Sequence, residues 1–321
     1  MRHVITGGSG FTGRYLAAAL VARGERVLIF DSDDSVATTP GAEFVRGDIR
    51  EAGDLSKLHL DSGDVVYHLA ARQFHAGVPR RNRDAWFANV NVLGTQRLLE
   101  AMSTAGAKRI ILFSTDMTYG MPDYTPVSSS HPQRPIGPYG RSKVAAETLL
   151  VNANREFGLR STIFRPRLIS GAGRLGILSK LFRLIKADLP VPLIGHGNNR
   201  YQMIGVEDCV TAALAAVDKV FPAGPFNLGS DNPPTIKELL TDLITRAGSR
   251  SIVLPTPAKA LQMTLSLLDK AGLTLLYPEQ FSIAHIDYVL DTSETKKALD
   301  WAPKKSDMDI IFNAYTAFAK S

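Results

Sequence analysis

The chain has 321 residues, of which 45% are hydrophobic and 21% are charged. This is the composition of a folded globular protein, so intrinsic disorder, collagen and coiled coil are excluded. At roughly 150 residues per domain, the length predicts two domains or one large α/β unit. The 37 Lys and Arg against 31 Asp and Glu leave a net charge of +6. Such a mild excess suits an anionic ligand and does not by itself indicate nucleic acid.

The single cysteine, Cys209, excludes an intramolecular disulfide and a multi-cysteine metal site, and no metal is expected. The stretch from Met1 to Thr6 lacks the apolar segment of a signal peptide. The longest apolar stretch, Leu261 to Tyr277, is interrupted by charged residues and is too polar to cross a bilayer unaided. We therefore expect a cytoplasmic protein without a membrane or nucleic-acid partner.

Short apolar runs alternate with helical patterns through the first half of the chain. The runs are Val4–Ile5, Val27–Phe30, Val65–Tyr67, Ile110–Phe113 and Thr162–Phe164. Residues 11–22, 83–105 and 139–157 carry apolar side chains at helical spacing. This alternation predicts an α/β fold with a doubly wound parallel sheet of the Rossmann type. It fades after Pro166, so we expect a Rossmann domain over 1–166 and a smaller mixed lobe over 167–321 that returns segments to the sheet.

A glycine-rich turn follows the first predicted strand, with Gly7, Gly10 and Gly13 opening a helix. Glycines at this spacing allow a tight turn, backbone approach to a pyrophosphate and close packing of helix on sheet. An acidic residue, Asp31, ends the second strand about 20 residues further on, where a carboxylate holds ribose hydroxyls. The pattern predicts a dinucleotide site and favours NAD over NADP.

Tyr139 has a lysine four residues further on, Lys143, so both side chains share one face of a predicted helix. A neighbouring ammonium lowers the pKa of a phenol and makes it a usable proton acceptor. Ser114, Thr115 and Asp116 end the preceding strand, at the edge where parallel sheets bind ligands. Asp116 is either a second acid or the cap of the turn.

These motifs together resemble the extended short-chain dehydrogenase/reductase family, in particular its NAD-dependent epimerase/dehydratase branch. The resemblance covers most of the chain, because its motifs occur in the family's order. They are the glycine turn at 7–13, Gly47-Asp48-Ile49, His68-Leu69-Ala70-Ala71, Asn89 to Thr95, Ser114 to Gly120, Tyr139 to Lys143, and Arg165-Pro166.

The resemblance implies roles for individual residues. The hydroxyl of Thr115 is expected to bind the reacting oxygen, Tyr139 to shuttle its proton, and Lys143 to bind the nicotinamide ribose. Asp116 is included among the expected catalytic residues. The cofactor residues are expected to be Gly7, Gly10, Phe11, Thr12, Gly13, Asp31, Asp48, Ile49, Leu69, Ala70, Ala71, Asn91, Ser114, Tyr139, Lys143, Arg165 and Pro166.

Departures from the family's patterns bear on the reaction and the substrate. Met117 stands where the related dehydratases have a glutamate base, and a thioether cannot take a proton. Arg200 is similar to an arginine that grips substrate phosphate, and we expect substrate contacts from Thr115, Arg200 and Leu168. Leu168 and Phe281, however, stand where the family has an asparagine and a second arginine. Either Arg167, Arg174, Lys180 or Arg183 compensates for this incomplete diphosphate clamp, or the run forms an amphipathic helix with a solvated basic face, which is the interpretation we favour.

We therefore expect an NAD-dependent epimerase of a nucleotide sugar that oxidises the sugar transiently at its 4-position. One alternative is an NAD(P)-dependent 4-keto-sugar reductase, or a steroid-type dehydrogenase of a non-nucleotide alcohol. Another is a protein that binds NAD without turnover. The resemblance also implies a homodimer formed through the helices at 83–105 and 139–157.

Overall fold

A parallel sheet organises the computed structural model, which describes residues 1–34, 39–74, 77–174, 178–274 and 276–320. Within these residues, seven strands form one sheet in the order β10-β6-β5-β4-β1-β2-β3, and every neighbouring pair is parallel. The strands are β1 (Arg2–Thr6), β2 (Arg26–Asp31), β3 (Glu43–Arg46), β4 (Val65–His68), β5 (Arg109–Phe113), β6 (Arg160–Pro166) and β10 (Phe226–Leu228).

All five predicted runs lie in this sheet, which confirms the doubly wound α/β fold. Their side chains are almost fully buried on both faces, as expected for a parallel sheet covered by helices. The sequence pattern did not predict β3 and β10. β3 is a half-buried edge strand flanked by charged residues, and β10 has only three residues.

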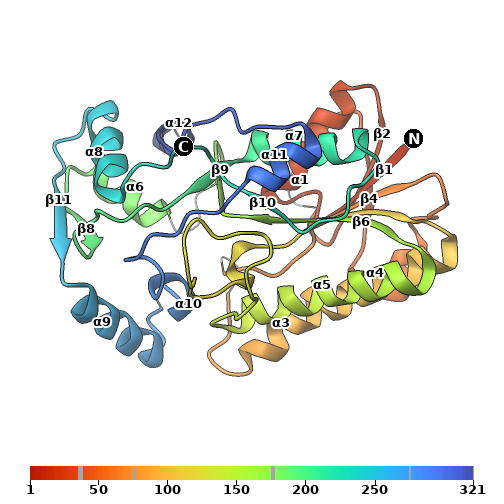
Figure 1. Ribbon diagram of the computed structural model, residues 1–321, viewed down its shortest axis with the longest axis horizontal. Coiled ribbons are helices and arrows are strands. Elements are labelled where there is room, and N and C mark those ends of the chain that lie inside the picture. The colour runs from red at the N-terminus through yellow and green to blue at the C-terminus, as the bar shows by residue number, and fades with distance from the viewer. Residues whose placement is uncertain (35–38, 75–76, 175–177, 275, 321) are drawn as a thin grey trace.

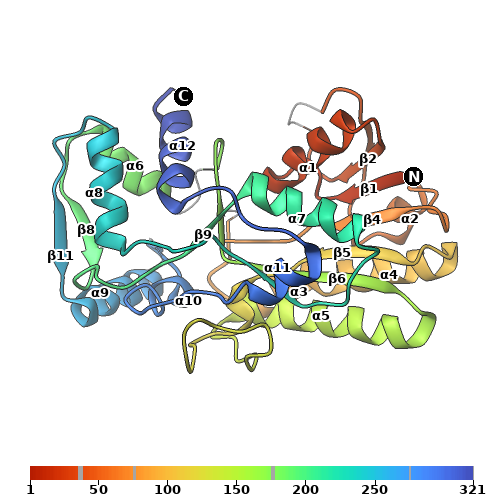
Figure 2. The ribbon, with the colours of Figure 1, turned by 45° about the horizontal axis from the view of Figure 1, so that its top comes forward.

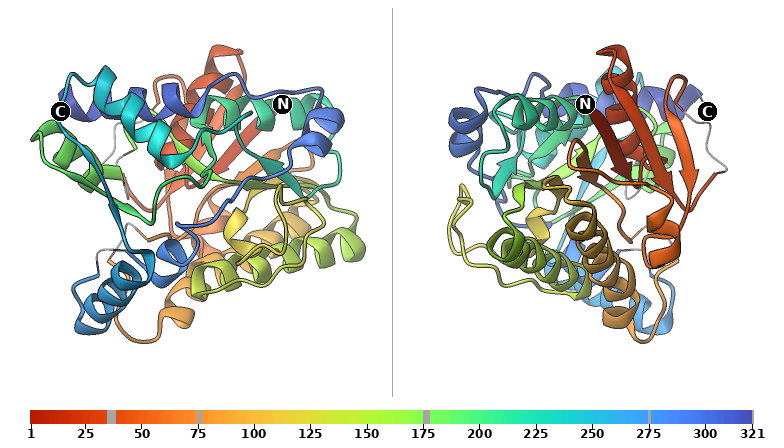
Figure 3. Two further views of the ribbon diagram at one scale, coloured as in Figure 1. Left: turned by 60° about the vertical axis from the view of Figure 1, so that its left-hand side comes forward. Right: turned by 90° about the vertical axis from the view of Figure 1, so that its right-hand side faces the viewer.

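Helices cover both faces of the sheet (Figure 1). On one face lie α1 (Phe11–Ala22), α7 (Val206–Asp218) and α11 (Ser293–Leu299). On the other lie α3 (Arg83–Asn91), α4 (Leu93–Ala105) and α5 (Pro138–Phe157), and the short helix α2 (Ala52–Ser56) packs against α4. The right-hand view of Figure 3 shows the sheet between these two layers.

The helical structure predicted over 83–105 is confirmed, although the segment is not one continuous helix. It is kinked into α3 and α4 at Val92, whose backbone angles are φ −101° and ψ −58°. Side-chain bonds surround the kink: the hydroxyl of Thr95 donates to the Asn91 carbonyl at 2.7 Å, and the Asn91 amide donates to Ser142 on α5 at 2.9 Å.

A second lobe lies beside one end of the sheet (Figure 2). It contains two small sheets and a separate core around Phe182, Leu243 and Ile311. Its elements are β7 (Leu168–Ser170), α6 (Leu178–Lys186), β8 (Val191–Ile194), β9 (Met203–Gly205), α8 (Ile236–Arg246), β11 (Val253–Thr256), α9 (Ala258–Ala271), α10 (Pro278–Phe281) and α12 (Asp307–Lys320). The segment that contains α7 and β10 leaves this lobe to pack against α1 and β6.

The start of α1 depends on Gly13. A Cβ at this position would lie 2.5 Å from the Gly7 carbonyl oxygen and 2.6 Å from the Gly8 Cα. Gly13→Ala should therefore force α1 away from the glycine turn and lower the free energy of unfolding by on the order of 1–3 kcal/mol. Urea denaturation measures this change. Gly53→Ala is the matched control, since a Cβ there meets nothing within 4 Å. Equal stability of the two variants would contradict this packing.

A buried carboxyl at the start of α12 predicts a pH dependence of stability. Asp307 is 1% exposed, accepts hydrogen bonds from the Met203 amide and the Ser230 hydroxyl, and burial raises its pKa to about 6. Because its pKa is raised on folding, its contribution to stability is fully present below the unfolded pKa and is lost as the pH rises through 6. Relative to Asp307→Asn, the wild type should lose about 2 kcal/mol between pH 4 and pH 7 in calorimetry. A pH-independent difference would contradict the assignment.

Candidate active site

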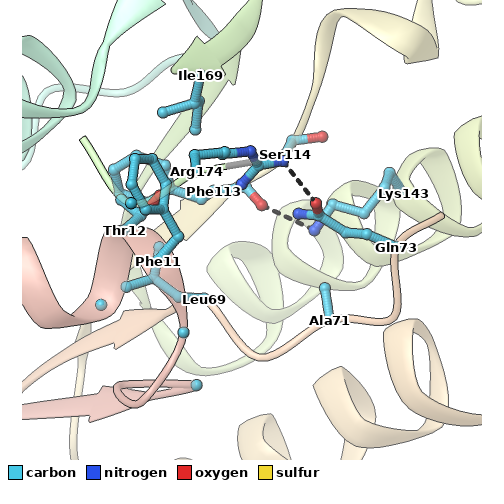
Figure 4. Close-up of a pocket in the computed structure, with 14 residues that line it drawn as sticks. Phe11, Thr12, Leu69, Ala71, Gln73, Phe113, Ser114, Lys143, Ile169 and Arg174 are labelled. Atoms are coloured by element: carbon cyan, nitrogen blue, oxygen red, sulfur yellow. Dashed lines mark hydrogen bonds between the residues drawn. The ribbon is translucent and has the colours of Figure 1, made fainter. Parts of the chain in front are cut away.

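A groove runs along the carboxyl edge of the sheet, between β1, β2 and β4. It consists of two cavities of about 280 and 320 Å³ that share Gly7, Gly10, Leu69 and Ala71. Most of the expected cofactor residues line it: Gly7, Gly10, Phe11, Thr12, Gly13, Asp31, Asp48, Ile49, Leu69, Ala70, Ala71, Ser114 and Lys143. Figure 4 shows how the first cavity opens between the start of α1, Leu69 and Lys143.

The glycine turn brings backbone, not side chains, to the floor of the groove. Gly7 has a φ of +73°, and a Cβ there would lie 2.5 Å from the Ala70 nitrogen. The cap residue of α1 is Gly10, which has no side chain that could bind the N–H groups of the first helical turn. The N–H groups of the first helical turn are therefore directed at the groove, where they attract an anion.

Carboxylates stand at the other end of the groove. Asp31 accepts a hydrogen bond from the Ser9 amide at 2.9 Å, which fixes its carboxylate beside the glycine turn. Asp48 forms an ion pair with Arg50, and this pair holds the pKa of Asp48 below its usual value. An acidic residue at the end of β2 suits ribose hydroxyls and repels a phosphate in that position.

Lys143 lies on α5 and is 4% exposed. Its ammonium donates to the carbonyl of Phe113 at the end of β5, at 2.7 Å (Figure 4). Burial lowers the pKa of Lys143 to about 8. The bond joins the helix that carries Tyr139 to the strand that precedes Thr115.

A buried ion pair stands behind the groove. Glu147 on α5 accepts from Arg165 at 2.6 and 3.0 Å and also from the Ser114 hydroxyl. Ser114 lines the groove, but Arg165 lines neither cavity of it. Arg165 therefore acts by holding β6, β5 and α5 together, and not by contact with a ligand in the groove.

A third cavity, of about 120 Å³, adjoins the groove, and we call it the substrate cavity. Thr115, Asp116, Tyr139, Pro166 and Leu168 line it. Ser114, Ile169, Gln73 and Arg174 line both this cavity and the groove. The expected proton carrier Tyr139 is thus separated from the expected cofactor groove by only one layer of residues.

Burial raises the pKa of Tyr139 well above its usual value. The largest opposing influence is the positive charge of Arg174, and a hydrogen bond with Thr115 acts in the same direction. Arg174 also donates to Gln73 at 3.2 Å and lies over the ring of Phe11 at 5.4 Å. Figure 4 shows it pointing across the cavity toward Gln73. Arg174 is therefore the cation whose charge lowers the pKa of Tyr139 most, whereas the ammonium of Lys143 is bound to the carbonyl of Phe113.

Asp116 and Arg167 form a buried ion pair in the wall of the substrate cavity. Asp116 also accepts from the Thr115 hydroxyl at 3.1 Å. The cap of the short 3-10 turn after β5 is Thr115, whose hydroxyl accepts from the Met117 amide at 3.2 Å, and not Asp116. The expectation of a solvated helix face is wrong for Arg167, which is 3% exposed, and for Arg174, which lines both the groove and the substrate cavity. It is confirmed for Lys180 and Arg183, which are exposed on α6.

Three expected ligand residues line none of these cavities: Arg165, described above, Asn91 and Arg200. The amide of Asn91 is buried and bonds to the backbone of Arg72 and to Ser142, so it shapes the wall of the groove from behind. Arg200 is exposed, donates to the Pro233 carbonyl at 2.5 Å and lines none of the three cavities.

The substrate cavity also contains residues that sequence reasoning missed. They are Phe74, Tyr201, Gln280 and Ile283, together with Gln73. Three of these come from the second lobe, and no local motif marks them. For Arg167 a signal existed, because a residue that directly follows a parallel strand lies at the ligand-binding edge of the sheet.

Glu279, from α10, supports the helix that carries Tyr139. Its carboxylate packs so closely on the cap residue Gly137 that a Cβ there would overlap it. Burial raises the pKa of Glu279 to about 7, and a hydrogen bond with the Tyr139 backbone opposes this rise. The second lobe thus contacts the first turn of α5 as well as the substrate cavity.

Within the described ranges, no group of three or more His, Cys, Asp or Glu side chains is placed to hold a metal ion. No helix in the same part of the chain is both long and apolar enough to span a membrane. Cys209 is fully buried, and burial raises the pKa of its thiol.

Comparison with known proteins agrees with this geometry. The protein y4nG of Sinorhizobium fredii, whose function is uncharacterised, is 30% identical over 312 residues, covering 97% of this chain and 77% of the relative. A UDP-glucose 4-epimerase of Rhizobium meliloti is 27% identical, covering 94% and 97% of the two chains. The crystal structure of the Thermotoga maritima UDP-glucose 4-epimerase with UDP-glucose superposes with a TM-score of 0.81 at 25% identity, over 100% and 99% of the chains.

The family model of the NAD-dependent epimerase/dehydratase family matches residues 3–229. This range includes the glycine turn, Thr115, Tyr139 and Lys143. The match extends from β1 to the end of the sheet at β10. The chain therefore belongs to the NAD-dependent epimerase/dehydratase family and is an NAD-dependent enzyme of the epimerase type.

Proposed function

We propose that the enzyme inverts the 4-position of a nucleotide sugar by transient oxidation, with Thr115, Tyr139 and Lys143 as its catalytic residues. One observation carries the proposal: Thr115 and Tyr139 line a small cavity that shares a wall with the groove beside Lys143. A sugar carbon in that cavity would be within reach of both the two hydroxyls and the groove.

The groove fits NAD. Its glycine floor leaves room for a pyrophosphate at the start of α1, and Asp31 is fixed where it would bind the ribose hydroxyls. NAD held there would supply the hydride acceptor and donor that transient oxidation of a sugar carbon requires. Asp48 and Ile49 would flank the adenine, and Lys143 would hold the nicotinamide ribose while it remains bound to Phe113.

The residues of the substrate cavity would move one proton. Tyr139, as the phenolate, would take the proton of the 4-hydroxyl and become the neutral phenol, while Thr115 holds the same oxygen with its hydroxyl. The charge of Arg174 favours the phenolate form of Tyr139, which is the form that accepts this proton. After the 4-keto sugar has turned its other face to the groove, Tyr139 returns a proton to the oxygen.

Elimination of water is disfavoured by Met117. Its side chain lines the substrate cavity beside Asp116, where a base for dehydration would be needed. A thioether cannot accept a proton at neutral pH. The carboxylate of Asp116 is already engaged by Arg167 and Thr115. Oxidation and reduction at one carbon needs no further base.

A second candidate function has an observation in its favour. Leu168 lines the substrate cavity, Phe281 is 6% exposed, and Arg200 is bound to a backbone carbonyl outside it. These three residues stand where the resemblance to the family places the residues that bind the diphosphate, and none of them offers the expected polar group to the cavity. An incomplete diphosphate site favours a 4-keto-sugar reductase or a dehydrogenase of a non-nucleotide alcohol.

Replacing the proposed proton carrier tests the mechanism. Tyr139→Phe should lower the rate of epimerisation of UDP-sugars on the order of 100-fold or more, because the 4-hydroxyl loses its proton acceptor. NAD content should stay unchanged, since Tyr139 does not line the groove. Tyr124→Phe is the matched control, because Tyr124 is 49% exposed and lines none of the three cavities. A Tyr139→Phe variant with more than about a tenth of the wild-type rate would overturn the assignment.

The state of the cofactor separates the two candidate functions. An epimerase regenerates its cofactor in every turnover, so we expect stoichiometric NAD to be released when the purified enzyme is denatured, as measured by absorbance and mass. A protein that is purified empty and binds NADH or NADPH reversibly would instead favour the reductase or dehydrogenase.

A further inference from the structure

The most unusual side chain of the substrate cavity is Arg167. It follows β6, is 3% exposed, and lines the cavity together with Thr115 and Tyr139. The rings of Tyr201 and Tyr288 lie on its guanidinium, each with its centroid 4.1 Å from Cζ. Such stacking covers the faces of the planar group, so further polar partners must approach along its edges.

Only one of the three guanidinium nitrogens of Arg167 has a hydrogen-bond partner among the described residues. Nη1 donates to the carboxylate of Asp116. Nε and Nη2 are buried and have no hydrogen-bond partner among the described residues. These two nitrogens form one edge of the guanidinium, whose parallel N–H groups match the two oxygens of a carboxylate or phosphate. Leaving such buried donors unpaired is costly, so this edge is suited to a ligand.

The charges of the cavity favour an anion as well. Its lining contains two arginines, Arg167 and Arg174, and one carboxylate, Asp116, which leaves one net positive charge. Asp116 cannot neutralise the free edge of Arg167, because it is bound to Nη1. A neutral sugar would leave this charge uncompensated in a buried site.

We infer that Arg167 binds a carboxylate carried by the sugar ring, so that the preferred substrate is a nucleotide-linked uronic acid rather than a neutral hexose. The inference rests on the proposed function for the position of the sugar. It assigns to Arg167 a role in substrate specificity, with Asp116 as the residue that fixes its orientation.

The position of Arg167 distinguishes a ring carboxylate from the diphosphate. Asp116 connects Arg167 to Thr115, the residue proposed to hold the 4-oxygen, through a hydrogen bond of 3.1 Å and a buried ion pair. In a hexopyranose the carboxyl carbon is attached to C5, next to C4. The diphosphate is attached to C1, across the ring from C4. An anion close to the 4-oxygen is therefore the ring carboxylate.

The test measures binding and does not depend on turnover. In NAD-loaded protein with the Tyr139→Phe change, titration calorimetry compares UDP-glucuronic acid, UDP-glucose and UDP. We expect UDP-glucuronic acid to bind most tightly. Adding Arg167→Leu should lower the affinity for UDP-glucuronic acid on the order of 30-fold or more, because a buried charge-assisted contact is lost. The affinity for UDP-glucose should fall less than about threefold.

Two further variants keep the test valid if Arg167→Leu does not fold. Arg167→Lys keeps the positive charge but lacks the two parallel N–H donors of the guanidinium, and it should also lose most of the preference for UDP-glucuronic acid. The double variant Asp116→Asn with Arg167→Leu removes both charges of the buried pair and avoids an unpaired carboxylate. Arg160→Leu, an exposed arginine at the opposite end of β6, is the control and should keep the preference.

The outcomes separate the inference from the proposed function. An equal loss of affinity for UDP-glucuronic acid, UDP-glucose and UDP would mean that Arg167 binds the diphosphate and would overturn the inference. Equal affinities of the two sugars for the parent protein would overturn it too. Selective binding of UDP-glucuronic acid that Arg167→Leu abolishes supports it, even if the wild type epimerises neither sugar, in which case only the proposed reaction fails.

Discussion

The hydrogen bond from the ammonium of Lys143 to the carbonyl of Phe113 joins the two parts of the chain on which the site depends. It fixes α5 against the end of β5, so that Tyr139 from the helix and Thr115 after the strand line one cavity. Both groups are buried, and an unpaired ammonium there would be costly. Burial also lowers the pKa of Lys143 to about 8, because the charged ammonium is less favourable away from water.

The second lobe completes the site from the opposite side. Arg83 on α3 forms an ion pair with Asp269 on α9 at 2.8 Å, and the ring of Phe74 stacks on that of Tyr277 at 4.9 Å. Glu279 follows on α10 and packs on the start of α5. A ligand that contacts the second lobe is therefore coupled to the helix that carries the proposed proton carrier.

Local sequence patterns predicted the groove well but the substrate cavity poorly. The glycine turn and Asp31 lie within about 25 residues of each other, and their roles follow from one strand, one turn and one helix. The burial of Arg167 depends on Asp116, Tyr201 and Tyr288, which are distant in the chain and meet only in the fold. The sequence alone therefore predicts a solvated Arg167, as for the other basic residues of its run.

In the proposed reaction the sugar is oxidised and reduced again at one carbon, beside Thr115 and Tyr139. Incubation of the wild type with a UDP-sugar deuterated at C4, followed by mass and NMR analysis of both epimers, tests it most directly. The account predicts that the product keeps deuterium at C4, without exchange with solvent and without net formation of NADH. Loss of the deuterium to water, or its accumulation in free NADH, would contradict the account.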